Sequence, residues 1–403
     1  MNKFFGINNA HIKNINRGLV LQCIACNDGL SRIDISKRIG LTKMAVTNIV
    51  NELINDGFVI EKDIVQTAFV GRNPVILDIA VNAPFVIGLY ISRTKVSVVV
   101  TDLKLRLQYE NNIILQDETS ETLTKKLFML TDDAIKYQYK KNSKVIPIGI
   151  GVSAIGPLDS TTGKILKPTN FFGIQNMNVV RLLKSRYGLP VFLENDMDAA
   201  ALAEKLFGVG RPYANFLYLG ITSGIGSGIF SNGKLYRGTS GFVGEIGHMS
   251  VNFDGIPCGC GNRGCLEMYI NLPIILQRLC EATGRGDISP KEFESLLEID
   301  GCDAVFEDMA NKLSAALVNA TNMLDPECII IGHEGVYLPD KYINYLQEHI
   351  GTRILSSGYK TLAVLKSSFG EHAPLFGSAC SVLQKLFEGY LFNAYKKGDK
   401  TNV

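Results

Sequence analysis

The chain has 403 residues, of which 46% are hydrophobic and 20% charged, and its formal net charge is +2. This composition is ordinary for a globular protein and predicts two or three domains with an ample core. It excludes a membrane-spanning protein, because no apolar run approaches the length that crosses a bilayer. The start of the chain lacks a secretory signal pattern, and nine unevenly spread cysteines are typical of a reducing compartment. We therefore expect a cytoplasmic protein.

The positive charge is concentrated near the N-terminus. Residues 1–80 hold nine basic and seven acidic residues, which accounts for the whole excess. Between residues 11 and 43, six basic residues accompany two acidic ones. Such a patch is compatible with phosphate contacts, although a solvated protein face has a similar composition.

The same region has the pattern of a helix-turn-helix. Residues 32–39 read as a short amphipathic helix that Ser31 caps and Gly40 ends. Thr42 caps a second helix, whose apolar side chains share one face: Val46, Ile49, Val50, Leu53 and Ile54. The opposite face carries polar or flexible side chains: Lys43, Met44, Thr47, Asn48 and Asn51. With an upstream helix at roughly 14–26, we expect the second helix to enter the major groove of DNA; the alternative is an ordinary helical bundle.

Two short β-rich runs follow, at 58–60 and 75–79, and predict the hairpin of a winged helix. The segment between them contains Gly71-Arg72-Asn73-Pro74. An arginine held between glycine and proline suits a narrow minor groove, where the negative potential is enhanced. Arg72 is thus a candidate DNA contact; equally, it is an exposed arginine in a Gly-Pro turn.

From Phe85 onward the pattern alternates between buried strands and helices, which predicts α/β architecture. The expected strands are 85–89, 96–101, 145–152, 191–193 and 216–219. Asn195 and Asp196 stand where one strand runs into an Ala-rich helix, the edge at which α/β folds bind ligands. Asp196 is a general base, a hydrogen-bond acceptor or a helix N-cap. The Gly-rich segment 220–228 reads as a turn whose amides hold a phosphate or a hydroxyl, although tight hairpins look similar.

The most specific motif is a histidine followed by three closely spaced cysteines. His248, Cys258, Cys260 and Cys265 form a set suited to tetrahedral zinc, with no open coordination position. Glycines around the cysteines allow the tight backbone that such convergence needs. Glu245 and Glu267 flank the set without being needed as ligands, so we expect them to line a pocket that the metal shapes. Buried thiols beside a core histidine are the alternative.

Taken together, these motifs resemble the ROK family of repressors, open reading frames and sugar kinases, over essentially the whole chain. The resemblance is carried by Glu-Asn-Asp at 194–196, the Gly-rich segment at 220–228, Gly-Glu-Ile-Gly-His at 244–248 and the cysteine motif at 258–267. It implies an N-terminal winged helix-turn-helix followed by a two-lobed, actin-like sugar-kinase fold. It also implies zinc on His248, Cys258, Cys260 and Cys265, and sugar hydroxyls at Asn195, Asp196, Glu245, His248 and Glu267.

The chain departs from the kinases of this family where they approach ATP. Their Asp-x-Gly-Gly-Thr turn is degenerate here, with Tyr90, Ser92 and Arg93 in place of the acidic residue and the glycines. Side chains thus stand where the backbone must meet phosphate. A later Gly-Gly pair of the nucleotide site is Gly332-His333. We therefore expect a binding protein without catalytic residues.

The winged helix and Gly-Arg-x-Pro place the chain with the repressors of the family, similar to xylose and N-acetylglucosamine repressors. We expect a cytoplasmic, sugar-responsive repressor of carbohydrate genes, with the effector between the lobes and a homodimer or dimer of dimers on operator DNA. The expected domains are 1–80 for the winged helix, 81–195 plus about 375–403 for the first lobe, and 196–374 for the second, with the zinc loop and a dimerisation surface. The alternatives are a sugar kinase with a DNA-binding head, and a regulator that senses a protein partner and keeps a vestigial sugar site.

Overall fold

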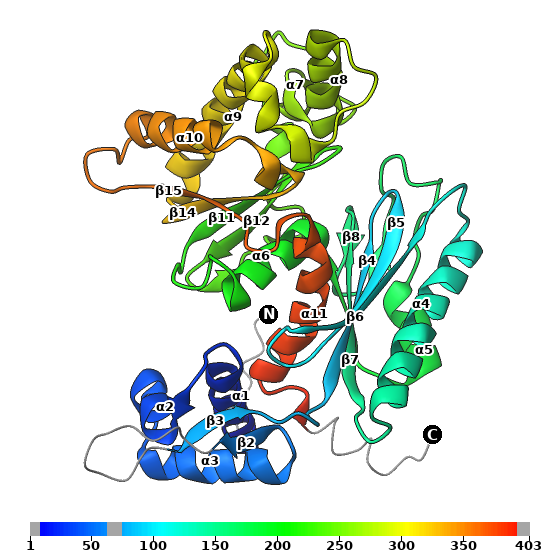
Figure 1. Cartoon of the computed structure of the whole chain (residues 1–403), viewed down its shortest axis with the longest axis vertical. Coiled ribbons are helices and arrows are strands. Elements are labelled where there is room, and N and C mark those ends of the chain that lie inside the picture. Colours follow the sequence, from blue (N-terminus) through cyan, green and yellow to red (C-terminus); the bar gives the residue numbers. More distant parts are fainter. Residues whose placement is uncertain (1–8, 63–74, 393–403) are drawn as a thin grey trace. The chain divides into compact units, whose positions relative to one another are not determined.

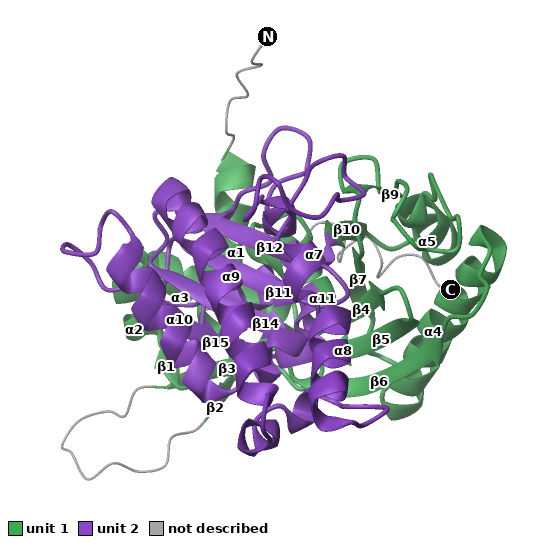
Figure 2. Cartoon of the chain, turned by 90° about the horizontal axis from the view of Figure 1, so that it is seen from above, with its two compact units in different colours: residues 1–194, 378–403 green, residues 195–377 purple. Residues whose placement is uncertain are grey.

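The computed structural model describes residues 9–62 and 75–392. The chain forms two compact units, which Figure 2 colours separately. Unit 1 comprises residues 1–194 and 378–403, and unit 2 comprises residues 195–377. The winged helix thus belongs to the same unit as the first part of the α/β region.

Three helices and a small sheet form the N-terminal part of unit 1 (Figure 1). The helices are α1 (Asn9–Ala25), α2 (Arg32–Ile39) and α3 (Lys43–Asn55). The strands are β1 (Leu30–Ser31), β2 (Val59–Lys62) and β3 (Ile76–Ile79), in the antiparallel order β1-β3-β2. This is the expected winged helix-turn-helix, except that α1 begins at Asn9 rather than near residue 14.

The predicted caps of α2 and α3 are confirmed. The Ser31 hydroxyl accepts a hydrogen bond from the Asp34 N–H, and the Asp34 carboxylate accepts one from the Ser31 N–H in return. Gly40 ends α2 in the left-handed region, at φ 70°, which glycine adopts without strain. The Thr42 hydroxyl accepts from the Ala45 N–H and begins α3. These local signals set the sharp turn between the two helices.

A five-stranded sheet in the order β10-β7-β4-β5-β6 forms the α/β part of unit 1. Its strands are β4 (Phe85–Ile91), β5 (Lys95–Thr101), β6 (Leu107–Ile114), β7 (Pro147–Ala154) and β10 (Val191–Asn195), and a small hairpin adds β8 (Leu158–Asp159) and β9 (Lys164–Ile165). Odd-numbered residues of β4, such as Ile87 and Leu89, pack in a core with α4 (Ser120–Lys141) and α5 (Val179–Tyr187). Even-numbered Gly88 faces the last helix, α11 (Ala373–Phe387), which lies on the opposite face of the sheet (Figure 1).

The C-terminal segment of the chain packs very closely within unit 1. A Cβ atom on Gly151 would lie 1.7 Å from the Ser378 carbonyl oxygen, so only glycine allows α11 to approach β7 this closely. At the other end of α11, a Cβ atom on Gly18 would lie 2.0 Å from the Phe387 carbonyl oxygen. The Phe392 ring then packs edge-on against Phe58, with ring centroids 5.6 Å apart. The segment 378–392 thus packs against the winged helix.

A second contact joins the winged helix to the sheet of unit 1. Lys104, in the turn between β5 and β6, places Nζ 2.9 Å from Asp78 Oδ1 on β3 and also binds Asp28 after α1. The Lys104 side chain is only 7% exposed, whereas that of Asp28 is 85% exposed. Burial lowers the pKa of Lys104, but the two carboxylates outweigh it and raise the pKa. We call this group the Lys104 clasp.

Unit 2 is built on a second five-stranded sheet, in the order β13-β12-β11-β14-β15. Its strands are β11 (Phe216–Ile221), β12 (Ile225–Ser231), β13 (Lys234–Leu235), β14 (Cys328–His333) and β15 (Ala363–Lys366). Its α-helices are α6 (Asp196–Phe207), α7 (Glu267–Ile270), α8 (Leu272–Thr283), α9 (Cys302–Leu324) and α10 (Asp340–Arg353). Short 3-10 helices are η1 (Ile246–His248), η2 (Pro290–Glu292), η3 (Ser295–Glu298), η4 (Glu334–Tyr337) and η5 (Gly370–His372). Odd-numbered residues of β11, such as Leu217 and Leu219, pack in a core with α8, α9 and α10, while Gly220 and Gly228 face α6.

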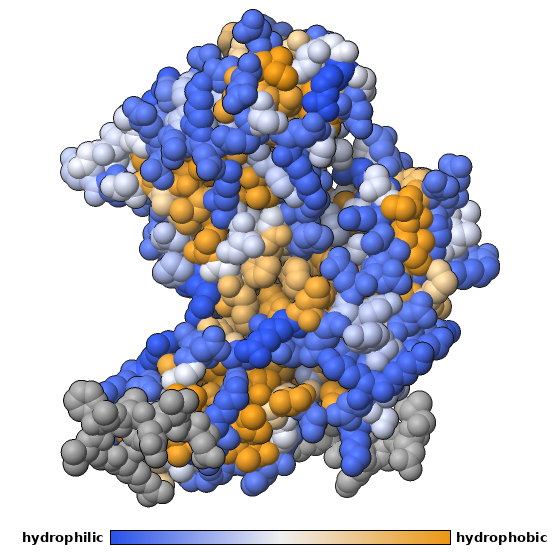
Figure 3. All heavy atoms as spheres, viewed as in Figure 1, coloured by the Kyte–Doolittle hydropathy of each residue, from blue (hydrophilic) through white to orange (hydrophobic). Residues whose placement is uncertain are grey.

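On the face drawn in Figure 3, hydrophobic side chains reach the surface in separate groups between hydrophilic ones. Among the exposed apolar side chains of unit 2 are Met323, Leu355 and Tyr359, which are 80%, 91% and 93% exposed. Within residues 9–62 and 75–392, every helix is too short or too polar to cross a membrane.

Candidate functional site

The predicted reading face of α3 is exposed, as a DNA contact requires. Lys43, Met44 and Asn48 are exposed and Thr47 is half-buried. The opposite face packs in the winged helix through Val46, Ile49, Val50 and Leu53. Ile54, expected in that buried row, is only half-buried because it lies in the last turn. Arg72 lies outside the described residues.

Arg32 connects α2 with α3 and with β2 through its side chain. Arg32, the first residue of α2, donates to the Asn51 side-chain oxygen at 3.2 Å and forms an ion pair with Glu61 on β2 at 2.6 Å. Asn51, expected on the reading face, therefore has a structural contact. The first two turns of α3 hold the remaining candidates for reading bases, and the N-terminal residues of a recognition helix are those that reach base edges.

The start of α6 carries two of the predicted sugar-binding residues. Asn195 is the N-cap, since its Oδ1 accepts from the N–H groups of Met197 and Asp198 at 2.9 and 3.4 Å. The alternative in which Asp196 caps this helix is wrong, because Asp196 is already its first helical residue. The Asp196 side chain is 7% exposed, and its Oδ1 accepts from the Met197 N–H at 3.0 Å. A carboxylate fixed in this way is suited to accept hydrogen bonds from a ligand.

The Gly-rich segment 220–228 is mostly a β-hairpin and not an open turn. Gly220 pairs with Gly226 across β11 and β12, and only residues 222–224 form the turn. The glycines of the hairpin make room for α6, because a Cβ atom on Gly220 would lie 2.4 Å from Met197 Sδ. At the turn, a Cβ atom on Gly224 would lie 3.5 Å from Glu267 Oε2. The hairpin thus packs against the start of α6 at Gly220 and lies beside Glu267 at Gly224.

His248, Cys258, Cys260 and Cys265 converge in unit 2, with one ligand atom from each within 4.8 Å of the others. The Cys260 and Cys265 sulfurs are 3.7 Å apart, and His248 Nδ1 is 3.7 Å from the Cys258 sulfur. A tetrahedral ion with metal–sulfur bonds of about 2.3 Å places neighbouring sulfurs about 3.8 Å apart. The donor types and their separations therefore fit a four-coordinate metal ion.

The backbone around the cysteines is tightly turned. The Cys258 N–H donates to the Asn262 carbonyl oxygen at 2.8 Å, and Gly264 adopts φ 66° where a Cβ atom would lie 1.7 Å from the Asn252 carbonyl oxygen. Burial and the neighbouring thiols raise the pKa of Cys265 to about 12. A divalent cation offsets this penalty, because its charge stabilises the thiolates that bind it.

Both flanking glutamates contact His248, Glu267 through its side chain and Glu245 through its backbone. Glu267 Oε1 is 3.3 Å from His248 Nδ1 and 3.6 Å from the Cys258 sulfur. The Glu245 carbonyl oxygen accepts from the His248 N–H at 3.0 Å, and Glu245 itself is exposed. Since His248 Nδ1 faces the thiols, Nε2 is the ring nitrogen left to meet a ligand. His248 Nδ1 and the Glu267 carboxylate thus both border the Cys258 sulfur.

The turn after β4, where we expect the kinase motif to be degenerate, is closed by the Ser92 side chain. Ser92 Oγ accepts from the N–H groups of Thr94 and Lys95 at 3.3 and 3.1 Å and donates to the Lys95 carbonyl oxygen at 2.9 Å. Two backbone amides of this turn are thus bonded to a hydroxyl of the chain. Ser92 was predicted only to fill space, and its hydrogen bonds depend on the hairpin geometry.

A buried histidine ends β14. His333 is 3% exposed at φ 52°, a region that favours glycine, and its Nδ1 is 3.1 Å from the Tyr218 hydroxyl oxygen. Burial lowers the pKa of His333 to about 3, so the imidazole is neutral. Tyr218 was not predicted from the sequence, because a tyrosine within an apolar strand has no local signal of a buried polar partner.

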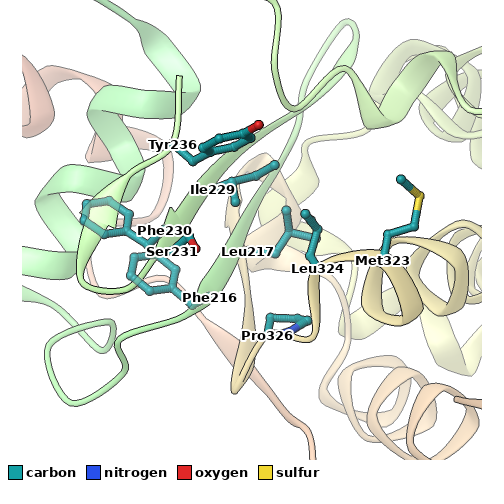
Figure 4. A pocket seen from close by; sticks show the side chains of 9 residues that line it. All are labelled: Phe216, Leu217, Ile229, Phe230, Ser231, Tyr236, Met323, Leu324 and Pro326. Carbon is teal, nitrogen blue, oxygen red and sulfur yellow. The ribbon is translucent and has the colours of Figure 1, made fainter. Parts of the chain in front are cut away.

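A pocket of about 260 Å³ in unit 2 is lined by none of the predicted sugar-site residues (Figure 4). It is lined by Phe216 and Phe230, which pair at the end of the β11–β12 hairpin opposite to its turn, and by Tyr236 and Met323. Its lining is mainly apolar and lacks the carboxylates expected for sugar hydroxyls. The pocket therefore does not belong to the predicted sugar site.

Two family models match the chain. A model described as the ROK family matches residues 86–385, and one described as winged helix-turn-helix DNA-binding matches residues 13–60. A putative xylose repressor from Caldicellulosiruptor sp. (strain Rt8B.4) is 31% identical over 396 residues, which cover 94% of this chain and 98% of that protein. The DNA-binding transcriptional dual regulator NagC of Escherichia coli (strain K12) is 26% identical, covering 94% and 95%.

Solved structures agree in fold. A ROK family transcriptional regulator, a homologue of the E. coli MLC protein, has a TM-score of 0.80 and 25% identity and covers 96% of this chain and all of that one. The ROK hexokinase of Thermus thermophilus has a TM-score of 0.63 and 28% identity, with 75% of this chain and 99% of that chain covered. The regulator spans the winged helix as well, whereas the kinase covers only about three quarters of this chain.

Proposed function

Because this chain belongs to the ROK family, we propose that it is a sugar-controlled repressor of carbohydrate genes, in which the winged helix binds operator DNA and unit 2 binds the sugar. The observation that carries this proposal is the exposed reading face of α3, within a winged helix-turn-helix that precedes the ROK region. Relatives of nearly full length are named xylose repressors, so xylose is the first sugar to test.

The DNA contacts that we propose are Lys43, Met44, Thr47 and Asn48 in the major groove. The N-terminal turns of α3 present these residues away from the hydrophobic face. Arg72 remains the candidate for the minor groove or the phosphate backbone. A homodimer would present two such helices to the two halves of a palindromic operator.

The sugar site that we propose consists of Asn195, Asp196, Glu245, His248 and Glu267, all within unit 2. Its three carboxylates are acceptors for hydroxyl groups, and they would repel the charge of a sugar phosphate. We therefore favour an unphosphorylated sugar. The sugar controls DNA binding only if it binds two conformations of the chain with different affinities.

Zinc is the metal that we assign to His248 and the three cysteines. The separations of these donors support a closed tetrahedral site, which is typical of structural zinc. When bound, the ion contributes no reaction and holds the loop in shape. His248 is then fixed in orientation, with Nε2 available to a sugar hydroxyl.

The closed turn at Ser92 and the buried His333 support a protein that binds sugar without phosphorylating it. The Ser92 hydroxyl holds two backbone N–H groups at the first place, and the Tyr218 hydroxyl holds the His333 N–H at the second. The second candidate function, a sugar kinase with a DNA-binding head, is favoured only by the retained, buried Asp196. Transfer of phosphate from ATP to a sugar, abolished by Asp196→Asn, would establish that second function.

Exposed apolar side chains support a dimerisation surface on unit 2. Asn322, the residue before Met323, accepts from the Leu355 N–H through its side chain at 2.9 Å, so the segments that carry the exposed Met323 and Leu355 meet. Met323 also lines the apolar pocket of Figure 4. Apolar groups gathered in this way mark protein–protein contacts, so we place the contact between protomers here.

The test of the proposed function is operator affinity with and without xylose, in the wild type and in Asp196→Ala. We expect xylose to change the affinity of the wild type and to leave that of the variant unchanged, while both bind DNA equally without sugar. Asp300→Ala, an exposed carboxylate of unit 2, is the matched control and should respond like the wild type. A full xylose response in Asp196→Ala would remove this residue from the effector site. If xylose has no effect on the wild type, thermal unfolding with a panel of other neutral sugars shows whether the sugar or the site is wrong. A sugar that binds at one hundred times its Kd stabilises the protein by about 2.7 kcal/mol.

A further inference from the structure

Met44 has no packing role that explains an apolar residue at its position. It is 73% exposed, which makes it the most exposed large hydrophobic side chain among residues 9–62 and 75–80. It is the second residue of α3, the part of a recognition helix that lies deepest in the major groove. An apolar side chain placed there has one partner of matching chemistry on the base edges, the 5-methyl group of thymine.

The neighbouring threonine strengthens this interpretation. Thr47 is three residues after Met44, so the two side chains share one helix face. The Thr47 hydroxyl donates its hydrogen to the Lys43 carbonyl oxygen at 2.8 Å, within the helix. This bond occupies the only hydrogen of the hydroxyl in the structure, which leaves the methyl group as the apolar part that Thr47 offers to a base.

We propose that Met44 and the Thr47 methyl group form an apolar contact that selects thymine in each half of the operator by its 5-methyl group. This inference rests on the proposed placement of α3 in the major groove. It separates two kinds of contact on one helix, because Lys43 supplies charge to the phosphates and Asn48 carries an amide that forms hydrogen bonds. The methyl contact adds specificity without any hydrogen bond.

The test uses the full chain and the duplex that it selects from a randomised DNA library. Each thymine of that duplex is replaced in turn by deoxyuridine, which removes the methyl group and keeps every hydrogen-bonding group of the base. We expect the wild type to lose affinity roughly fourfold at one thymine of each half-site, the effect of one methyl group returned to water. Met44→Ala should bind the thymine duplex more weakly and should show a smaller further loss with deoxyuridine at that position, since only the Thr47 methyl group remains.

Matched variants separate the contributions of this face. Thr47→Val keeps a methyl group and should retain the deoxyuridine effect, whereas Thr47→Ser keeps only the hydroxyl and should weaken it. Lys43→Gln should lower affinity for all sequences alike and leave the deoxyuridine effect intact. Thermal unfolding of Met44→Ala should match the wild type, since the side chain is exposed.

The outcomes distinguish this inference from the proposed function. If a duplex is selected but deoxyuridine has no effect at any position, or acts equally on the wild type and Met44→Ala, the methyl contact is wrong and the repressor function stands. If Thr47→Ser behaves as the wild type and Thr47→Val does not, the hydroxyl reads the base and the inference fails for Thr47. If the library yields no preferred sequence, both the inference and the proposed DNA-reading function are overturned.

Discussion

The Lys104 clasp offers a sharp test of how the winged helix is held within unit 1. We propose Lys104→Met, which keeps the long apolar stem and removes the charge. The substitution leaves Asp78, whose side chain is 12% exposed, with Lys62 as its remaining cationic partner. The Asp78 carboxylate then stays buried with one cationic partner fewer to offset its loss of hydration. The free energy of unfolding should therefore fall.

The magnitude follows from the titration of Asp78. Burial raises the pKa of Asp78, but hydrogen bonds from Lys62, Lys104 and the Ile79 N–H outweigh this and lower it from 3.8 to about 2. Since one pKa unit corresponds to about 1.4 kcal/mol, these partners together stabilise the fold by about 2.5 kcal/mol. Lys104 is one of two cationic donors, so we assign it about 1 kcal/mol, and Asp28 adds little because it is exposed.

The assay is thermal unfolding of the full chain, where we expect Lys104→Met to lower the Tm of unit 1 by about 2–4 °C near neutral pH. Asp78 has a lowered pKa in the fold, so its contribution is complete above about pH 4 and is lost as the pH falls through about 2. The difference between wild type and variant should shrink over that range. Lys125→Met, in the exposed ion pair with Glu121, is the control and should change the Tm by less than about 1 °C.

A Lys104→Met protein that melts like the wild type would refute this reasoning. So would a difference that persists unchanged at the lowest pH, because the clasp requires an ionised Asp78. Operator affinity is a second, independent measurement. If the clasp holds the winged helix in its DNA-binding orientation, the variant binds operator more weakly, whereas Lys104→Arg, which keeps the charge, restores binding in part.

Two further predictions concern the metal loop and the contact between protomers. Metal analysis of the purified protein should find about one zinc ion per chain. The Cys260→Ser variant should lose that ion and most of the sugar response, while operator binding persists. Full zinc content in the variant would contradict the ligand assignment. Leu355→Asp, which places a charge among exposed apolar side chains, should shift the protein from dimer to monomer in analytical ultracentrifugation, and an unchanged mass would place the contact elsewhere on the chain.

The sequence predicted those features that depend on local spacing. The caps at Ser31 and Thr42 and the buried face of α3 follow from helical periodicity and the hydrogen bonds of single side chains. The histidine and three cysteines were recognisable because the outer cysteines are only seven positions apart, which forces them to lie close together. Short-range chemistry of this kind needs no knowledge of the fold.

Features that depend on distant residues were not predictable in the same way. Lys104 meets Asp28, which is 76 residues away, and a lysine in a polar turn gives no sign of being buried. The Gly-rich segment 220–228 looked like a phosphate turn, but its glycines make room for Met197 of α6. The buried lysine and the glycines are both explained by residues that are distant in the sequence and that only the tertiary structure brings close.

The close packing of α11 has a consequence for the synthesis of the protein. Unit 2 is one uninterrupted stretch, residues 195–377, whereas unit 1 is completed only by the residues that follow it. A nascent chain that ends at Gly377 holds all of unit 2 but lacks most of the helix that packs against Gly151 and Gly18. Domains fold as they leave the ribosome. Unit 2 can therefore complete its fold before unit 1 does, although its synthesis begins later. A chain truncated before residue 378 therefore lacks the segment that packs against the winged helix at Gly18 and Phe58.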